Sequence, residues 1–332
     1  MKQFLGFISI LFISLTFQAR AEGFNPAIIF DMGGKFDKAF NEAAYNGAEK
    51  FKKETGISYK EFEITNESQR EQALRTLAKR GANIIVIAGF AAKSPLEKVA
   101  KEFPKVKFTL IDAELDMPNV QSIIFKEHEG SFLVGALAAM TSKTNKIGFV
   151  GGMDIPLIRN FACGYTQGAK YANSKTEVME NMVGTTSAAW NDPPRGAELA
   201  KSQFDRGADI VYAAAGATGL GVYQAANDSK KFAIGVDQNQ NYLHPGTMLT
   251  SMIKHVDVAT YNAFISAQKN EWKPGIYVLG LKENGVDWAL DEYNKNLISK
   301  ETEEKINQIR QDIINGKISV VDYNKSNNCP VR

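Results

Sequence analysis

Two aromatic side chains stand in polar loops, where they have little hydrophobic core to fill. Phe36 lies in the segment DMGGKFDKAFN at 31–41, and Trp190 lies in SAAWNDPP at 187–194. Stacking of a flat ring on an aromatic side chain contributes on the order of 1–3 kcal/mol per face. We therefore interpret Phe36 and Trp190 as opposite walls of one binding site. The alternatives are a hydrophobic staple beside a helix for Phe36 and a core position for Trp190.

Carboxylates stand where several apolar runs end. Asp31, Asp112 and Asp237 each close such a run. A carboxylate can accept hydrogen bonds from two neighbouring hydroxyls, an arrangement that fits a ribose diol. Lys254 follows the strand-like stretch 251–253, from which it could pair with Asp237 or donate to a sugar oxygen. An ordinary solvated lysine is the alternative, and spacing alone favours it.

Smaller polar and backbone groups complete the candidate set. Asp37 and Asn41 could contact a ligand or cap the helix that follows them. The stretch GATGLG at 216–221 has the order G-x-x-G-x-G, whereas a dinucleotide-binding loop needs G-x-G-x-x-G. We interpret it as a flexible turn into a helix, in which the backbone of Gly216 could approach a ligand.

The sequence lacks the motifs of common enzymes. None of its three histidines, at 128, 244 and 255, lies four positions from another metal-ligand type, and neither a G-x-S-x-G elbow nor a phosphate-binding loop occurs. Calcium held by aspartates, as in a nucleoside hydrolase, would need a tight acidic cluster, but the aspartates are scattered. His128, between Glu127 and Glu129, is expected at the surface. We expect no enzymatic activity, no metal and no cofactor.

The segments that must position these residues alternate between strand and helix. Continuous apolar runs are separated by stretches with helical spacing. Runs of this kind without polar alternation predict parallel strands that are covered on both faces. The expected strands are 27–30, 59–64, 83–88 and 107–111, and the expected helices between them include 40–53 and 68–80.

The second half of the chain repeats the layout of the first. An RGAN segment begins at Arg80, 32 positions before Asp112, and an RGAD segment begins at Arg206, 31 positions before Asp237. Any doubly wound protein shows similar runs, but the matching tetrads favour duplication. We therefore expect two similar α/β lobes. Ligands of such sheets bind outside the carboxyl ends of the strands, so two facing lobes would form a hinged trap.

The N-terminus has the pattern of a secretory signal. Lys2 precedes an apolar run from Phe4 to Phe17, and Ala-Arg-Ala follows at 19–21. A membrane anchor is the alternative, but the run is shorter than the roughly 20 residues that span a bilayer. We expect cleavage after Ala21. No cysteine lies near that site, so we expect no lipid anchor.

Size and charge limit the remaining possibilities. Removing residues 1–21 takes away two basic residues and no acidic one, so 39 basic and 37 acidic residues become 37 and 37. A balanced charge gives no electrostatic basis for binding nucleic acid or an anionic membrane. A mature chain of about 311 residues is more than one core usually accommodates, which also predicts two domains.

Cys163 and Cys329 are the only cysteines. Export to an oxidising compartment permits a disulfide between them, which would tie the C-terminal tail to the second half of the chain. Two unrelated buried thiols are the alternative. Neither cysteine has a Cys or His neighbour at ligand spacing, so a metal site is not indicated.

Segment 31–41 resembles the D-x-G-x-x-D-x-S-F-N signature of the basic membrane protein family, the purine nucleoside receptors of ABC importers. Two positions depart from the family pattern: Ala39 replaces the usual Ser, and Trp190 stands where many members carry Phe. The larger indole is expected to narrow or shift base preference. Many members of the family are lipoproteins, whereas we expect no lipid anchor on this chain. The resemblance continues at 89–90, 108–112, 129–139, 148–153, 156–159, 190–196, 235–237 and 251–254.

The resemblance implies an α/β type I periplasmic-binding-protein fold, with two doubly wound parallel-sheet lobes joined by a hinge. We predict an N-terminal lobe of 24–125 plus 255–285 and a C-terminal lobe of 126–254 plus 286–332. By analogy, Phe36 and Trp190 would enclose the base and Asn41 would grip it. The predicted ligand-binding set is Asp31, Phe36, Asp37, Asn41, Gly89, Phe90, Asp112, Trp190, Gly216, Asp237 and Lys254, with Asp112, Asp237 and Lys254 serving the sugar.

The expected function is that of a monomeric periplasmic receptor. It would capture a purine nucleoside such as adenosine, inosine or guanosine and deliver it to an ABC permease in the membrane. A binding protein of the same fold for a sugar or signalling molecule is the first alternative. A nucleoside-cleaving enzyme is the second.

Overall fold

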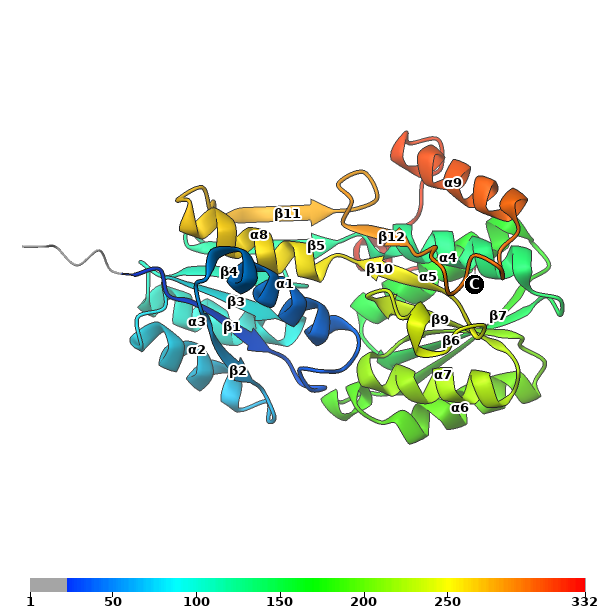
Figure 1. The fold of residues 1–332 in the computed structure, drawn as a ribbon, viewed down its shortest axis with the longest axis horizontal. Coiled ribbons are helices and arrows are strands. Elements are labelled where there is room, and N and C mark those ends of the chain that lie inside the picture. Colours follow the sequence, from blue (N-terminus) through cyan, green and yellow to red (C-terminus); the bar gives the residue numbers. More distant parts are fainter. Residues whose placement is uncertain (1–22, 332) are drawn as a thin grey trace, which may run out of the picture.

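The computed structural model describes residues 23–331, which form two lobes side by side (Figure 1). Each lobe contains one six-stranded sheet with helices on both faces. All strand pairs are parallel except one at the edge of the second sheet. The prediction of two parallel α/β lobes is therefore confirmed. The predicted signal peptide at 1–21 lies outside the described residues.

The N-terminal lobe is built on the sheet with strand order β11-β5-β4-β3-β1-β2. Its strands are β1 (Pro26–Phe30), β2 (Lys60–Glu63), β3 (Ile84–Ala88), β4 (Lys107–Ile111), β5 (Val120–Phe125) and β11 (Gly275–Leu279). One face is covered by α1 (Phe40–Thr55) and α8 (Val256–Gln268), the other by α2 (Gln69–Lys79) and α3 (Lys93–Glu102). Alternate residues of β1 enter two separate cores, which is why this strand is apolar throughout.

The C-terminal lobe repeats the plan with strand order β12-β10-β9-β8-β6-β7. Its strands are β6 (Lys146–Met153), β7 (Glu177–Gly184), β8 (Ile210–Ala214), β9 (Phe232–Asp237), β10 (Met248–Lys254) and the antiparallel β12 (Val286–Trp288). Helices α4 (Glu127–Thr141) and α5 (Pro156–Ala172) pack together, and α6 (Pro193–Asp205) packs with α7 (Gly219–Asp228). α4 and α5 pack so closely that a Cβ at Gly168 would collide with the carbonyl of Phe132. The absence of a side chain at this glycine therefore permits the close approach.

The chain passes between the lobes three times. It leaves the first sheet after β5 to enter α4, returns after β10 to enter α8, and leaves again between β11 and β12 (Figure 1). Lys254, the last residue of β10, therefore stands at the second passage. None of the helices within residues 23–331 is long and apolar enough to cross a membrane.

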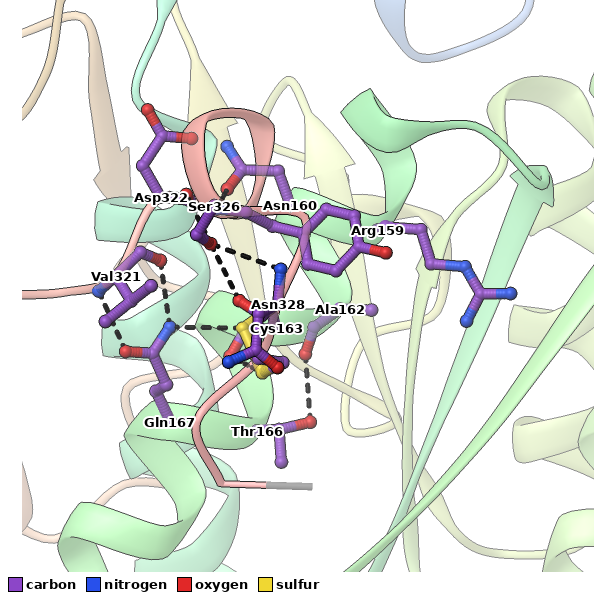
Figure 2. The surroundings of a disulfide bond; sticks show 12 residues. Arg159, Asn160, Ala162, Cys163, Thr166, Gln167, Val321, Asp322, Ser326 and Asn328 are labelled. Atoms are coloured by element: carbon purple, nitrogen blue, oxygen red, sulfur yellow. Dashed lines mark hydrogen bonds between the residues drawn. A yellow bond between two sulfur atoms is a disulfide. The ribbon is translucent and has the colours of Figure 1, made fainter.

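A C-terminal strap, residues 318–331, follows α9 (Lys300–Ile314) and lies along α5. Cys163 of α5 is disulfide-bonded to Cys329, with 5.6 Å between their Cα atoms, so of the two alternatives that the sequence left open the disulfide is the one formed (Figure 2). Gln167 of α5 forms two hydrogen bonds with the backbone of Val321, at 2.8 and 3.0 Å. The strap also contains the short helix α10 (Tyr323–Ser326). The tail is thus fixed to the C-terminal lobe by covalent and polar contacts.

Candidate functional site

A cavity lies between the lobes, where the carboxyl ends of the two sets of strands face each other. Its empty space is about 590 Å³, part of which is open to solvent. The predicted residues that line it are Asp31, Asp37, Asn41, Gly89, Phe90, Asp112, Trp190, Gly216, Asp237 and Lys254.

Phe36 does not line the cavity, which corrects the prediction that it faces Trp190. Its side chain is 60% exposed, and its ring packs edge-on against Tyr45 of α1 at 5.2 Å. Lys35 lies 4.8 Å above the same ring while its ammonium pairs with Glu61 at 2.7 Å. These contacts hold Phe36 on the outer side of its loop, so Phe36 and Trp190 do not form a sandwich.

Other aromatic residues line the cavity instead. Phe40, the first residue of α1, and Phe161 of α5 both face it, together with Phe90 and Trp190. Phe40 begins the expected helix 40–53 but is not in the predicted ligand-binding set, and neither is Phe161. The pattern Leu157-Ile158…Phe161, directly after a strand end, was the available signal.

Trp190 is held in place by glycines on both sides. Its six-membered ring lies against Gly152 of β6, where any Cβ would collide with it. A Cβ at Gly33 in the opposite lobe would lie 3.3 Å from the Cβ of Trp190. Gly216, which opens a 3₁₀ turn continuing into α7, would place a Cβ 3.2 Å from the Trp190 carbonyl. The predicted flexible turn at 216–221 is therefore mostly helical.

Asn41 organises the first loop of the N-terminal lobe. Its amide nitrogen donates to the carbonyls of Asp31 at 3.1 Å and Gly34 at 3.3 Å, and its oxygen accepts from the N–H of Asp31 at 3.0 Å. Both amide hydrogens are thus used within the lobe. A ligand could engage only the remaining lone pair of the Asn41 oxygen.

Asp37 combines the two roles that the sequence left open. Its carboxylate accepts backbone N–H bonds from Ala39, Asn41 and Glu42 at 2.8, 3.1 and 3.1 Å, as a helix cap does, and it also lines the cavity. Burial raises the pKa of Asp37 to about 6, although the three N–H bonds oppose the change.

Asp31 is fixed by a residue that sequence reasoning missed. Arg70 of α2 donates to Asp31 Oδ1 through Nη2 at 2.6 Å and through Nε at 3.2 Å. The two side chains are 7% and 13% exposed, so little solvent screens the pair. Arg70 therefore orients the carboxylate that ends β1.

Lys254 lies in a buried charge cluster beside the cavity, so the alternative of a solvated lysine is wrong. Its ammonium is 2.7 Å from Asp112 Oδ2 and 3.1 Å from Glu127 Oε1, rather than in contact with Asp237. The three side chains are at most 5% exposed. Rings of three aromatic residues surround the ammonium at 5.1–5.5 Å: Phe40, Phe125 and Phe161.

The cluster contains more carboxylates than ammonium groups. Burial raises the pKa of Glu127 and of Asp237 to about 7 in each case. Burial alone would lower the pKa of Lys254, but attraction by Asp112, Glu127 and Asp237 outweighs it and raises that pKa. Asp112 Oδ1 is buried and has no hydrogen-bond partner within residues 23–331. The cluster can therefore accept further hydrogen bonds from hydroxyl groups.

Equivalent strand ends carry Asp112 and Asp237. Both adopt the left-handed region, with φ of 70° and 66°, at the ends of β4 and β9. Glu127, which sequence reasoning placed beside a surface histidine, begins α4 just after the first passage between lobes. His128 is 5% exposed and contacts Asn160 of α5 at 3.1 Å, so its expected surface position is wrong. The first turn of α4 is buried because α5 and the strap cover it.

Lowering the pH from 8 to 5 is expected to stabilise the ligand-free protein. The carboxyls of Asp37, Glu127 and Asp237 keep protons up to about pH 6–7 in the folded state, whereas unfolded carboxyls release them near pH 4. Between these values the folded state binds more protons, so each group adds at most about 1.4 kcal/mol per pH unit as pH falls. Urea unfolding at several pH values measures this slope.

The Asp237→Asn variant provides the control for that titration, because it removes one of the three groups. Its free energy of unfolding should depend less steeply on pH than that of the wild type. Equal slopes in the two proteins, or wild-type stability that rises from pH 5 to 8, would contradict the assignment of raised pKa values to this site.

Comparisons with known proteins give concordant results. Residues 24–324 match the family described as ABC transporter substrate-binding protein, PnrA-like. The chain is 34% identical over 329 residues to basic membrane protein A2 of Borrelia garinii, covering 96% of this chain and 95% of that protein. It is also 36% identical over 287 residues to an uncharacterized lipoprotein of Pyrococcus furiosus, covering 82% and 72% of the two chains.

Solved structures share the architecture. An ABC transporter solute-binding protein from Aeropyrum pernix superimposes with a TM-score of 0.83 and 28% identity, covering 93% of this chain and 99% of that one. A solute-binding protein from Conexibacter woesei gives a TM-score of 0.74 at 22% identity, with 90% and 99% coverage. The predicted type I periplasmic-binding-protein fold is therefore confirmed.

Proposed function

The chain belongs to the PnrA-like family of ABC transporter substrate-binding proteins, and from that premise we propose that it binds a purine nucleoside between its lobes and delivers it to an ABC permease. The observation that carries this proposal is the pairing, in one cavity, of an aromatic wall with a buried cluster of carboxylates around Lys254. The aromatic wall suits a flat base. The carboxylates suit a neutral group rich in hydroxyls.

The two halves of the cavity would bind the two halves of a nucleoside. Trp190, Phe90, Phe40 and Phe161 offer ring faces and edges to the base. The unpartnered oxygen of Asp112 can accept a hydrogen bond from a ribose hydroxyl, and Asp237 can accept another.

We further propose that the protein acts as a monomer in the periplasm after removal of residues 1–21. A freely diffusing receptor would differ from relatives named as lipoproteins. Membrane fractionation of the producing cell tests this point: the protein should be released with the periplasmic fraction and should carry no fatty acid.

Replacing Trp190 by alanine is expected to weaken inosine binding by about 1–3 kcal/mol, because it removes one stacking surface for the base. Isothermal titration calorimetry measures the change. Tyr171→Ala, which removes an aromatic ring that is 55% exposed and outside the cavity, serves as the control and should bind like the wild type. An unchanged affinity for Trp190→Ala would remove the indole from the site.

Mass spectrometry of small molecules released by denaturing the purified protein tests the ligand class directly. A purine nucleoside is the expected result. Release of a sugar, together with calorimetry that detects sugar but not inosine, adenosine or guanosine, would favour the alternative ligand. Appearance of free hypoxanthine on incubation with inosine would show cleavage and contradict a transport role.

A further inference from the structure

Hydrogen bonds join the two lobes outside the ligand cavity. The side chain of Gln240, which follows β9, donates from Nε2 to the backbone carbonyl of Lys38 in the opposite lobe at 2.8 Å. Two further contacts cross the same cleft: Asn46 Nδ2 to Gln238 Oε1 at 2.9 Å and Ser187 Oγ to Glu67 Oε1 at 2.5 Å. These contacts can exist only while the lobes are closed.

From this geometry we propose that Gln240 is a positioning residue that stabilises the closed cleft and so sets the rate at which the ligand leaves. The inference rests on the proposed binding function, because it concerns the retention of the same ligand. Gln240 is absent from the residues that line the cavity, so it acts on the lobes rather than on the ligand.

The side chain of Gln240 is fixed in one orientation. It is 1% exposed, and its oxygen accepts hydrogen bonds from the Tyr223 hydroxyl at 2.8 Å and the Val236 N–H at 2.7 Å. Gly235 makes room for it, since a Cβ there would lie 2.5 Å from that oxygen. With Oε1 held twice within its own lobe, Nε2 must point toward the other lobe.

The acceptor in the opposite lobe is equally well defined. Lys38 adopts a left-handed conformation with φ of 63° in the turn before α1, and its carbonyl accepts the hydrogen bond from Gln240. Its neighbour Asp37 lines the cavity, as do Val236 and Asp237 on the other side. The hydrogen bond from Gln240 to Lys38 therefore joins the two loops that carry cavity residues of opposite lobes.

The other two contacts are expected to contribute less. The hydrogen bond between Asn46 and Gln238 is exposed. The bonds from Ser187 to Glu67 and from Gln240 to Lys38 are both partly buried, but the acceptor Glu67 is an exposed side chain. Water competes well for exposed groups, so their net contribution to closure is small. A buried donor with a fixed orientation costs little further ordering when the lobes meet.

A ligand held by a hinged receptor escapes from the open state. Its apparent dissociation rate therefore rises as the closed population falls. Loss of one well-placed hydrogen bond, with an unfavourable contact in its place, should change that population about tenfold. Association, which begins from the open state, should change little.

The Gln240→Glu variant tests this proposal. A glutamate retains an oxygen that accepts from Tyr223 and Val236, but it turns the donor facing Lys38 into a second acceptor. Gln238→Glu is the matched control: it adds the same charge two positions away, yet its interlobe role is that of acceptor from Asn46, which glutamate preserves. Stopped-flow measurement of intrinsic tryptophan fluorescence during inosine binding gives both rate constants.

We expect inosine to dissociate about tenfold faster from Gln240→Glu than from the wild type, with association rates within about twofold. Gln238→Glu should match the wild type in both rates. Tyr223→Phe, which removes one hydrogen bond to Gln240, should speed inosine dissociation about threefold. If Gln240→Glu fails to fold, the dissociation rate of Tyr223→Phe tests the proposal in its place. Equal dissociation rates in wild type, Gln240→Glu and Gln238→Glu would overturn the proposal.

Failure of the proposed function would give a different result. A wild-type protein that does not bind inosine contradicts nucleoside binding but not closure by Gln240. Small-angle X-ray scattering of the ligand-free proteins then decides: Gln240→Glu must have a larger radius of gyration than Gln238→Glu. Equal radii would refute the role of Gln240 in closure.

Discussion

Replacing Lys254 by methionine is expected to raise the dissociation constant for a purine nucleoside at least about 100-fold and to lower the free energy of unfolding by about 3–5 kcal/mol at pH 8. The ammonium is 1% exposed and contacts Asp112 and Glu127 at 2.7 and 3.1 Å. Methionine retains much of the side-chain volume but leaves these carboxylates without a counter-ion. Calorimetry and urea unfolding measure the two effects.

The loss of unfolding free energy in Lys254→Met should diminish as the pH falls toward 5, because the uncompensated carboxylates can then take up protons. Lys53→Met removes an exposed lysine of α1 and serves as the control for loss of one positive charge. Similar stability and affinity in Lys254→Met and Lys53→Met would contradict the central position of Lys254 in the site.

Removing the disulfide is expected to cost about 3–5 kcal/mol of stability. The bond joins residues separated by 166 positions, so it restricts the unfolded chain strongly. In the folded state, loss of the bond should release the C-terminal strap first, because only non-covalent contacts then hold it, among them the hydrogen bonds of Gln167 with Val321 and of Tyr323 with Asn160. Urea unfolding of Cys163→Ala/Cys329→Ala against the wild type measures the change.

Hydrogen exchange locates the effect. Amides of residues 321–329 should lose protection in the double variant before those of β6 and β8 do. Reducing agent should reproduce the loss in the wild type and leave the double variant unaffected. Identical urea midpoints for the oxidised wild type and the double variant would show that the strap does not depend on the bond.

The secondary structure was predictable where burial alone determines it. The mostly apolar run 107–111 coincides with β4, and 83–88 contains β3, because strands buried on both faces need mostly apolar residues. The same reasoning predicted that the carboxylates of Asp31, Asp112 and Asp237 lie at strand ends. Parallel strands end at one edge of their sheet, so these residues had to approach the cleft.

The remaining site residues depend on how the lobes meet, which spacing along the chain does not encode. Phe36 and Phe40 stand four positions apart in one motif, yet Phe36 packs on Tyr45 whereas Phe40 lines the cavity. Lys254 and Glu127 lie at different passages between the lobes. Their burial arises from a contact between segments that are remote in sequence, so spacing along the chain indicated neither the burial nor the pairing.

The threefold passage of the chain between lobes restricts how such a protein can diversify. Neither lobe corresponds to one uninterrupted stretch of polypeptide, since α8 and β11 complete the first sheet only after β10 has been made. Exchange of one lobe between relatives by recombination would need three simultaneous junctions. New cargo preferences should therefore arise in this architecture through substitutions at individual positions rather than through shuffling of whole modules.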